Sequence, residues 1–227
     1  MSAEEILDQV MARILWLAVL VCPLWAQKIS FDAAKPGPLP SGWSVAMTHE
    51  GGPPRWEVVA DPTAPSKPHV LAQTSTDNTS GRFPLAIYEN AVFTDGSLRV
   101  RFKPISGARD QAAGLVWRYK DPGNYYIVRA NALENNVVLY KVHDGKRISL
   151  PPKGTPSRAY GVKHPVPKLT WSTLAVRFTG TLFEVSFDGR RIMQVEDATF
   201  TARGKAGLWT KADSVTYFDD FQIEKRK

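Results

Sequence analysis

The pattern that most limits the fold of this chain is strict alternation of apolar and polar residues over short runs between turn residues. In "GSLRVRFKP" every second residue from Leu98 to Phe102 is apolar, and the residues between them are basic. A side-chain period of two places one kind on each face of a β-strand. We find no helical period of any length after residue 26. The chain is therefore predicted to be all-β, a sandwich or barrel.

Further strands and turns can be read along the chain. "AAGLVWRY" and "NYYIVRAN" flank the turn "DPGN", and "VVLYKV" precedes "HDGK", whose Asp-Gly pair suits a two-residue hairpin. "WSTLAVRFTGTLFEVSFDGRRIMQV" predicts three strands, with turns at Gly180 and at Asp188-Gly189. Residues 35–68 and 151–167 are rich in Pro, Gly and Ser and predict long loops. One domain over residues 27–227 is the economical interpretation.

The first 26 residues are typical of a secretory signal. "MARILWLAVLVCPLWA" has a basic start at Arg13, an apolar run, and a small residue before Gln27. The run is too short to span a bilayer of about 30 Å comfortably. The residues before Met11 are acidic, so we take Met11 as the true start; a buried N-terminal helix is the less favoured alternative. Cleavage would remove Cys22, the only cysteine, so we predict a disulfide-free bacterial protein, periplasmic or secreted, with no transmembrane segment in the mature chain.

The charge of the chain is +7. Loss of residues 1–26 would remove one arginine and three carboxylates, which leaves a more basic domain. This balance favours anionic partners, such as acidic glycans, envelope phosphates or nucleic acid. The basic residues are spread along the whole chain, and export argues against nucleic acid. Solubility alone explains the charge equally well.

Four segments carry a resemblance to a known superfamily: "FDAAKPGPLPSGW", "AAGLVWRYKDPGNYYIVRANALENNVVLYKVHDGK", "WSTLAVRFTGTLFEVSFDG" and "GKAGLWTKADSVTYFDDFQIE". Together they resemble concanavalin A-like domains, and among these the exported bacterial laminin-G-like and 3-keto-disaccharide hydrolase-type domains. The resemblance implies a two-sheet antiparallel jelly-roll sandwich whose curved sheet cradles a saccharide. It specifies the fold and leaves the activity open, because the superfamily includes lectins, glucanases and modules without a ligand.

No complete catalytic motif is present. Retaining glucanases of this superfamily carry Glu-x-Asp-x-x-Glu or Glu-x-Asp-x-Glu on one strand, where two carboxylates flank the glycosidic bond. Here Glu184 and Asp188 are four residues apart, and Glu196 and Asp197 are adjacent, so neither pair fits. A cluster of Glu134, Asp121 or Glu184 with a histidine in one cleft would favour a hydrolase of the 3-keto-disaccharide type.

No cofactor is predicted to be required, and structural calcium is one of two interpretations of a buried carboxylate. The four histidines are scattered singly, with no zinc-binding spacing. In "YFDDFQI", alternation places Asp219 on the buried side with Phe221 and Ile223, and Asp32 lies on a strand expected nearby. The two carboxylates could hold calcium. The favoured alternative is that Asp219 accepts hydrogen bonds from backbone N–H groups in the closing loop.

The middle of the chain supplies the candidate binding face. Pairing Trp117 with Tyr126 and Leu115 with Val128 would set the faces of the first hairpin. One face is then core: Ala113, Leu115, Trp117, Tyr126, Val128 and Ala130. The other face carries Val116, Arg118, Tyr125, Ile127 and Arg129. The strand around Arg101 is expected in the same sheet, so that its basic residues join this face.

Arginine forks can hold carboxylates or sugar hydroxyls, and aromatic rings can stack on sugars. The competing interpretation is structural. In it, the residues of "DPGN" and "DGK" only form turns, the tyrosines favour the strand conformation, and exposed arginines prevent aggregation through sheet edges. The candidate carbohydrate-binding residues are Arg101, Arg118, Tyr125, Arg129, Glu134, Asn136, Trp209 and Lys211.

These observations favour an exported β-sandwich that binds a carbohydrate, with an anionic glycan as one candidate ligand. The alternatives are a glycoside hydrolase of the 3-keto-disaccharide type and a non-enzymatic envelope or adhesion module. The last of these predicts a flat polar face.

Overall fold

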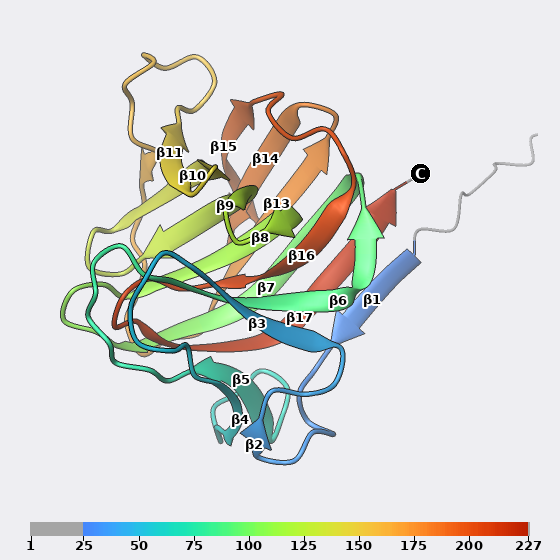
Figure 1. The fold of residues 1–227 in the computed structure, drawn as a ribbon, viewed down its shortest axis with the longest axis vertical. Coiled ribbons are helices and arrows are strands. Elements are labelled where there is room, and N and C mark those ends of the chain that lie inside the picture. The colour runs from blue at the N-terminus through green and yellow to red at the C-terminus, as the bar shows by residue number, and fades with distance from the viewer. Residues whose placement is uncertain (1–24, 227) are drawn as a thin grey trace, which may run out of the picture.

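A computed structural model describes residues 25–226 as two antiparallel β-sheets packed face to face (Figure 1). Within this range there is no helix, so the predicted all-β jelly-roll sandwich is correct. No helix of the described range is long and apolar enough to cross a membrane. The predicted signal lies outside the described residues, except for Trp25 and Ala26, which begin the first strand.

The first sheet has nine strands, in the order β15-β14-β13-β7-β17-β5-β4-β2, with β1 paired to β17. Its strands are β1 (Trp25–Ile29), β2 (Gly37–Pro38), β4 (Trp56–Ala60), β5 (His69–Gln73), β7 (Asp95–Ser106), β13 (Ser172–Thr179), β14 (Leu182–Phe187), β15 (Arg190–Glu196) and β17 (Val215–Arg226). Among residues 25–226, the strand β17 is the only one that joins β7 to β5, and it also pairs with β1.

The second sheet has eight strands, in the order β11-β10-β9-β8-β16-β6-β3, with β12 paired to β10. Its strands are β3 (Trp43–Thr48), β6 (Phe83–Phe93), β8 (Ala112–Asp121), β9 (Asn124–Asn131), β10 (Asn136–His143), β11 (Lys146–Leu150), β12 (Val162–Lys163) and β16 (Gly204–Trp209). Three strands, β2, β3 and β4, lie inside residues 35–68, so the prediction of one long loop there is wrong in part. These strands are short and flanked by Pro and Gly, so the alternation of apolar and polar residues could not be recognised in the sequence.

The main core lies between the two sheets, and the alternation read from the sequence supplies it. Leu98, Val100 and Phe102 of β7 are fully buried there. In the next strands, Leu174 pairs with Phe187, Val176 with Val185 and Phe178 with Phe183, and all six are buried, as the period of two predicts. The turns at Gly180 and Asp188-Gly189 are also found where the sequence predicts them.

The hairpin between β8 and β9 has the register expected from the sequence. Trp117 pairs with Tyr126, and Leu115 pairs with Val128. All six residues of the predicted core face belong to the main core. The two-residue turn in "HDGK" is confirmed as well, since Asp144 and Gly145 have φ values of 48° and 78°.

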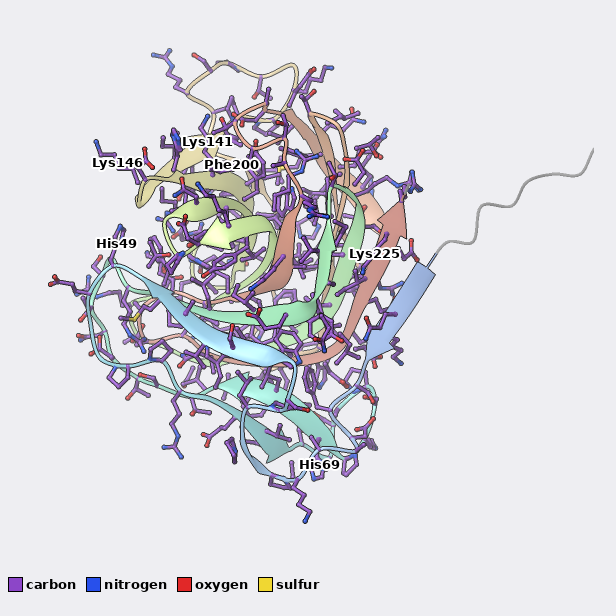
Figure 2. The ribbon with its side chains drawn as sticks, turned by 45° about the vertical axis from the view of Figure 1, so that its right-hand side comes forward. His49, His69, Lys141, Lys146, Phe200 and Lys225 are labelled. Carbon is purple, nitrogen blue, oxygen red and sulfur yellow. The ribbon has the colours of Figure 1, made fainter. Side chains whose placement is uncertain are left out.

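A second, inner core lies on the other face of the eight-stranded sheet, and all its buried members come from that sheet. The sheet must therefore curl until its own side chains cover one another. At one end, β3 reaches across to strands far from it in the sheet order. Thr48 donates to the carbonyl of Pro122 (2.6 Å), and the ring nitrogens of His49 lie 2.8 Å from the carbonyl of Gly81 and 2.7 Å from that of Gly145. Figure 2 shows His49 on the same side as Lys146, which follows Gly145.

Candidate functional site

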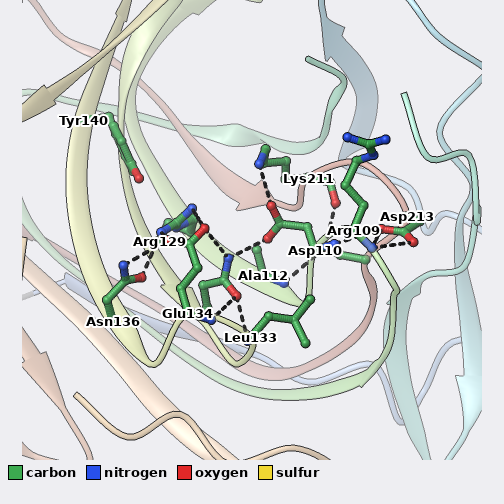
Figure 3. A network of polar contacts seen from close by, with 12 residues as sticks. Arg109, Asp110, Ala112, Arg129, Leu133, Glu134, Asn136, Tyr140, Lys211 and Asp213 are labelled. Carbon is green, nitrogen blue, oxygen red and sulfur yellow. Dashed lines mark hydrogen bonds and ion pairs between the residues drawn. The ribbon is translucent and has the colours of Figure 1, made fainter. Parts of the chain in front are cut away.

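Six polar residues meet at the edge of the inner core, and we call them the polar cluster (Figure 3). Neighbouring strands supply most of them: one comes from the middle of β9, two from the ends of β9 and β10, and one from the turn between them. The others precede β8 and follow β16. The polar cluster consists of Asp110, Arg129, Asn131, Glu134, Asn136 and Lys211.

Arg129 and Glu134 form the centre of the polar cluster. The Arg129 side chain is fully buried, and its Nη1 and Nη2 donate to the two oxygens of Glu134 at 3.2 and 2.8 Å. Nη2 also donates to Asn136, at 2.8 Å. Burial alone would raise the pKa of Glu134, but the hydrogen bonds and charge of Arg129 outweigh it and hold that pKa below its usual range. Glu134 is therefore a carboxylate at neutral pH.

Asn131 joins this pair to a second one. Its amide donates to Asp110 at 2.7 Å and to Glu134 at 3.1 Å, and Lys211 Nζ donates to Asp110 at 2.6 Å. Asp110 is itself held in place, because the backbone N–H groups of residues 108–110 all donate to the carboxylate of Asp213. The burial of Asp213 would raise its pKa, yet these three backbone donors lower it. The polar cluster is thus a built, mostly buried network.

Arg147, next to the polar cluster, has unused hydrogen-bonding capacity. Its guanidinium lies between the rings of Phe83 and Tyr140, with its central carbon 4.9 and 4.6 Å from their centroids. The guanidinium of Arg129 lies 5.6 Å from the same Tyr140 ring. Nη1 of Arg147 is buried and has no hydrogen-bond partner among the described residues. Buried polar groups are normally paired, so this unpaired Nη1 is an exception that a bound acceptor oxygen would explain.

Tyr160 and Lys211 complete the exposed part of this region. Tyr160 is 48% exposed, its hydroxyl is hydrogen-bonded to that of Tyr140, and its ring lies 6.0 Å from the guanidinium carbon of Arg129. The Lys211 ammonium donates to Asp110, which leaves two of its three N–H groups without an acceptor among residues 25–226. The four acceptor positions of Glu134 are already filled by Arg129, Asn131 and Asn136. The hydrogen-bonding groups that remain unpaired here are the N–H donors of Arg147 and Lys211, which suit ligands rich in oxygen acceptors.

Four of the predicted binding residues meet in the polar cluster: Arg129, Glu134, Asn136 and Lys211. Arg147 and Tyr160 were not predicted. Arg147 follows the Asp-Gly turn by two residues, and alternation along β11 could have placed it on the inner face. Tyr160 lies in the aperiodic segment 151–167, which gives no signal of its direction.

Tyr125 and Trp209 lie near the polar cluster in sequence, but both are fully buried in the inner core. The Tyr125 hydroxyl is hydrogen-bonded to Thr48, at 2.8 Å, and burial raises its pKa well above its usual range. The ring of Trp209 packs on Phe83, with 5.2 Å between centroids. The prediction that these rings are exposed to stack on a ligand is wrong, because the curl of the sheet encloses the face on which they lie.

Arg118 lies on the opposite side of its sheet from the one predicted. The β8–β9 register shifts after Trp117, and Arg118 has a φ of 48°, so the strict alternation breaks at this residue. Its guanidinium lies over Phe178 and Phe183, rings of the nine-stranded sheet. It donates to the carbonyls of Thr94, Phe200 and Gly180 and to the carboxylate of Asp95. Arg118 thus ties the sheets together.

Arg101 belongs to the other sheet, because β7 pairs with β13 and β17. The prediction that β7 lies beside the candidate face is therefore wrong. Arg101 is partly exposed on the outer surface, 3.9 Å from Asp220, and Lys103 is buried in an ion pair with Asp61. Arg118, Tyr125 and Arg129 do not line one concavity, since only Arg129 belongs to the polar cluster.

The buried position predicted for Asp219 is correct. Its oxygens accept hydrogen bonds from the backbone and hydroxyl of Ser66 and from the backbone of Asp220, the arrangement of the favoured alternative. Asp32 accepts from the backbone of His69 at 3.3 Å. Within residues 25–226 no group of three or more His, Cys, Asp or Glu side chains is placed to hold a metal ion. Calcium at Asp32 and Asp219 stays a prediction.

The three carboxylates considered for catalysis lie apart. Glu134 belongs to the polar cluster, and Asp121 accepts hydrogen bonds from its own turn at Gly123 and Asn124. Glu184 lies on the outer face of the nine-stranded sheet, where it accepts from Arg191 and Gln194. These positions do not assemble the cleft expected of the hydrolase alternative.

No protein-family model matches the chain, and no curated protein matches it. Solved structures share its fold. The carbohydrate-binding module CBM66 from Bacillus subtilis aligns with a TM-score of 0.60 at 20% identity, over 81% of this chain and 96% of that one. The cellulose-induced protein Cip1 gives 0.58 at 11% identity, over 87% and 96%. A Bacillus subtilis protein of unknown function with a galectin-like fold gives 0.52 at 15% identity, over 88% and 100%. These likenesses show that the chain shares their β-sandwich fold.

Proposed function

We propose that this domain binds a carbohydrate at the polar cluster, with Arg147, Lys211 and Tyr160 as the groups that contact it. The observation that carries the proposal is the guanidinium of Arg147, which is held between two rings and has a buried Nη1 without a partner. The rigid network behind it fixes donors in place, as a preformed binding site requires. The similar protein CBM66 is a carbohydrate-binding module, which supports the same ligand class.

We propose further that the ligand is an acidic saccharide. Arg147 has no carboxylate partner, whereas Arg129 and Lys211 each have one. A uronic or sulfated sugar would supply the missing negative charge and pair with a guanidinium in fixed geometry. The ring hydroxyls of the sugar would accept from the free N–H groups of Lys211. Tyr160 is exposed and able to contact the apolar face of a sugar ring.

The finer resemblance, to laminin-G-like and 3-keto-disaccharide hydrolase-type domains, stays a prediction. No observation in the described residues favours hydrolysis, so binding without cleavage is the proposal. An envelope or adhesion module without a saccharide ligand is the outcome expected if the proposal fails.

A glycan array of neutral and acidic saccharides tests the proposal. We expect wild-type protein to bind acidic members, and Arg147→Gln to lose about tenfold to a hundredfold in affinity, because one charged hydrogen-bond donor group is removed. Lys146→Gln is the matched control, since it removes the same charge at the neighbouring, exposed position. Absence of binding, or equal binding by the Arg147 variant, would overturn the assignment. Preference for neutral sugars would overturn only the proposal that the ligand is acidic.

Export is a separate proposal, supported by the apolar run and small residue within residues 1–26. Expression in a bacterium followed by N-terminal sequencing of the protein outside the cytoplasm tests it. We expect a mature chain that begins at Gln27. An intact chain that stays in the cytoplasm would contradict the proposal.

A further inference from the structure

The outer face of the nine-stranded sheet carries a groove that the function above does not use. It has a volume of about 280 Å³ and lies over β14, β13, β7 and β17, on the opposite layer from the polar cluster. Across the strands, Arg191 pairs with Ser186, Ser186 with Ala175, and Ala175 with Arg99. Two small residues thus form the floor, with an arginine at each end. Three steps between strands separate these arginines by about 14 Å.

Three arginines and two glutamates line this groove, so its net charge is positive. Arg177 and Arg191 are exposed, and both lie near Glu184, at 4.0 and 2.8 Å. Hydrogen bonds from Gln194 and Arg191 hold the pKa of Glu184 below its usual range, so this carboxylate balances part of their charge. The Arg99 side chain is exposed and forms no hydrogen bond or ion pair with any described residue. The uncompensated charge therefore lies at Arg99.

The basic surface continues past the groove. Arg191 also lines a second groove of about 260 Å³, together with Lys163, His164 and Arg190. The two grooves meet at Arg191 and form one track. It crosses β7, β13, β14 and β15 and ends at the edge of the sandwich, where β15 lies near β12 of the other sheet. We call this the outer track. A track of this length fits an extended chain better than a single small anion.

The residues between the arginines indicate which polyanion fits. Ser97, Gln222 and Glu224 also line the first groove, and they can exchange hydrogen bonds with hydroxyl groups. Neither groove is lined by Phe, Tyr or Trp, so the stacking platforms used for single-stranded nucleic acid are missing from the outer track. Closely spaced phosphates would also meet Glu184 and Glu224. Alternating charges and hydroxyls match a carboxylated polysaccharide.

We infer that the outer track is a second binding site, which takes an acidic polysaccharide along the outer face of the nine-stranded sheet and around its β15 edge. The two sites share no residue, although Lys163 of the outer track pairs with Asn136 and donates to the carbonyl of Glu134. The inference rests on Arg99 and Arg191, which lie on the nine-stranded sheet. With both sites occupied, one domain would hold two segments of polysaccharide at once, and its avidity would exceed that of either site.

The test measures dissociation constants for polygalacturonate, neutral dextran and a DNA duplex. Every chain carries Arg147→Gln, so that the polar cluster does not mask the result. We expect polygalacturonate to bind and neutral dextran not to bind. Arg99→Ser with Arg191→Ser is expected to weaken polygalacturonate binding about tenfold at moderate salt, because exposed ion pairs are partly screened.

The matched control is Arg55→Ser with Arg203→Ser, which removes the same charge from exposed positions outside the outer track. We expect it to change the affinity less than twofold. An equal loss in the control would show that net charge alone drives binding, and would overturn the site. DNA binding as tight as that of polygalacturonate, lost in the outer-track variant, would overturn the ligand class. No loss in either variant would overturn both.

Discussion

Replacing Arg118 by alanine is expected to lower the free energy of unfolding by about 4 kcal/mol. The guanidinium is almost fully buried and donates to three backbone carbonyls and to Asp95. Alanine would leave these acceptors unsatisfied and open a cavity against Phe178 and Phe183. For a domain of this size the midpoint of thermal unfolding should fall by about 10 °C. Urea denaturation followed by tryptophan fluorescence measures the change.

Arg101→Ala is the matched control for this prediction. It removes the same charge from a partly exposed side chain of the other sheet, whose nearest carboxylate is 3.9 Å away. We expect a change within about 0.5 kcal/mol. If Arg118→Ala cost no more than the control, the role of Arg118 as a tie between the sheets would be wrong.

The second large effect is expected at Glu134. Glu134→Gln should destabilise the fold by about 2 kcal/mol at pH 7, because it leaves the buried guanidinium of Arg129 without its charged partner. The loss is smaller than for a fully enclosed pair, since Glu134 is 39% exposed and solvent screens the interaction. Urea denaturation at several pH values measures it, and Glu196→Gln, which breaks an exposed pair with Lys153, is the control.

The pH dependence of this effect has a definite sign. The pKa of Glu134 is lower in the folded protein than in the unfolded chain. Its stabilising contribution is therefore complete above the unfolded pKa of about 4.3 and is lost as the pH falls through the folded value. The difference between wild type and Glu134→Gln should shrink below about pH 4. A difference that stays constant down to pH 3 would contradict an ionised pair.

Much of the fold could be predicted because alternation is a local signal. The strands β7 to β10 and β13 to β15, the register at Trp117 and Tyr126, and the Asp-Gly turns all follow from neighbouring residues. The strand β12 was missed, because it lies inside residues 151–167, which were predicted to be a loop. The sheet to which a strand belongs is set by packing between residues distant in the chain. The strand β7 was therefore assigned to the wrong sheet, and β2 to β4 were missed among prolines.

In the candidate site, too, contacts within one hairpin could be predicted, whereas contacts between residues distant in the chain could not. Arg129, Glu134 and Asn136 lie within one hairpin, so their proximity follows from the register of β9 and β10. Lys211 joins them because β16 is adjacent to β8, which the sequence does not show. Tyr125 and Trp209 point to the predicted face, but curling of the sheet encloses them. At Arg118, one extra residue in a bulge reversed the face.

The position of β17 has a consequence for how the chain acquires its fold. This strand alone links the β15-β14-β13-β7 half of its sheet to the β5-β4-β2 portion, and it also holds β1. During synthesis from the N-terminus, the residues of β17 follow those of all the other described strands. The nine-stranded sheet therefore cannot close until β17 has emerged from the ribosome, and its sequence-distant pairings form slowly.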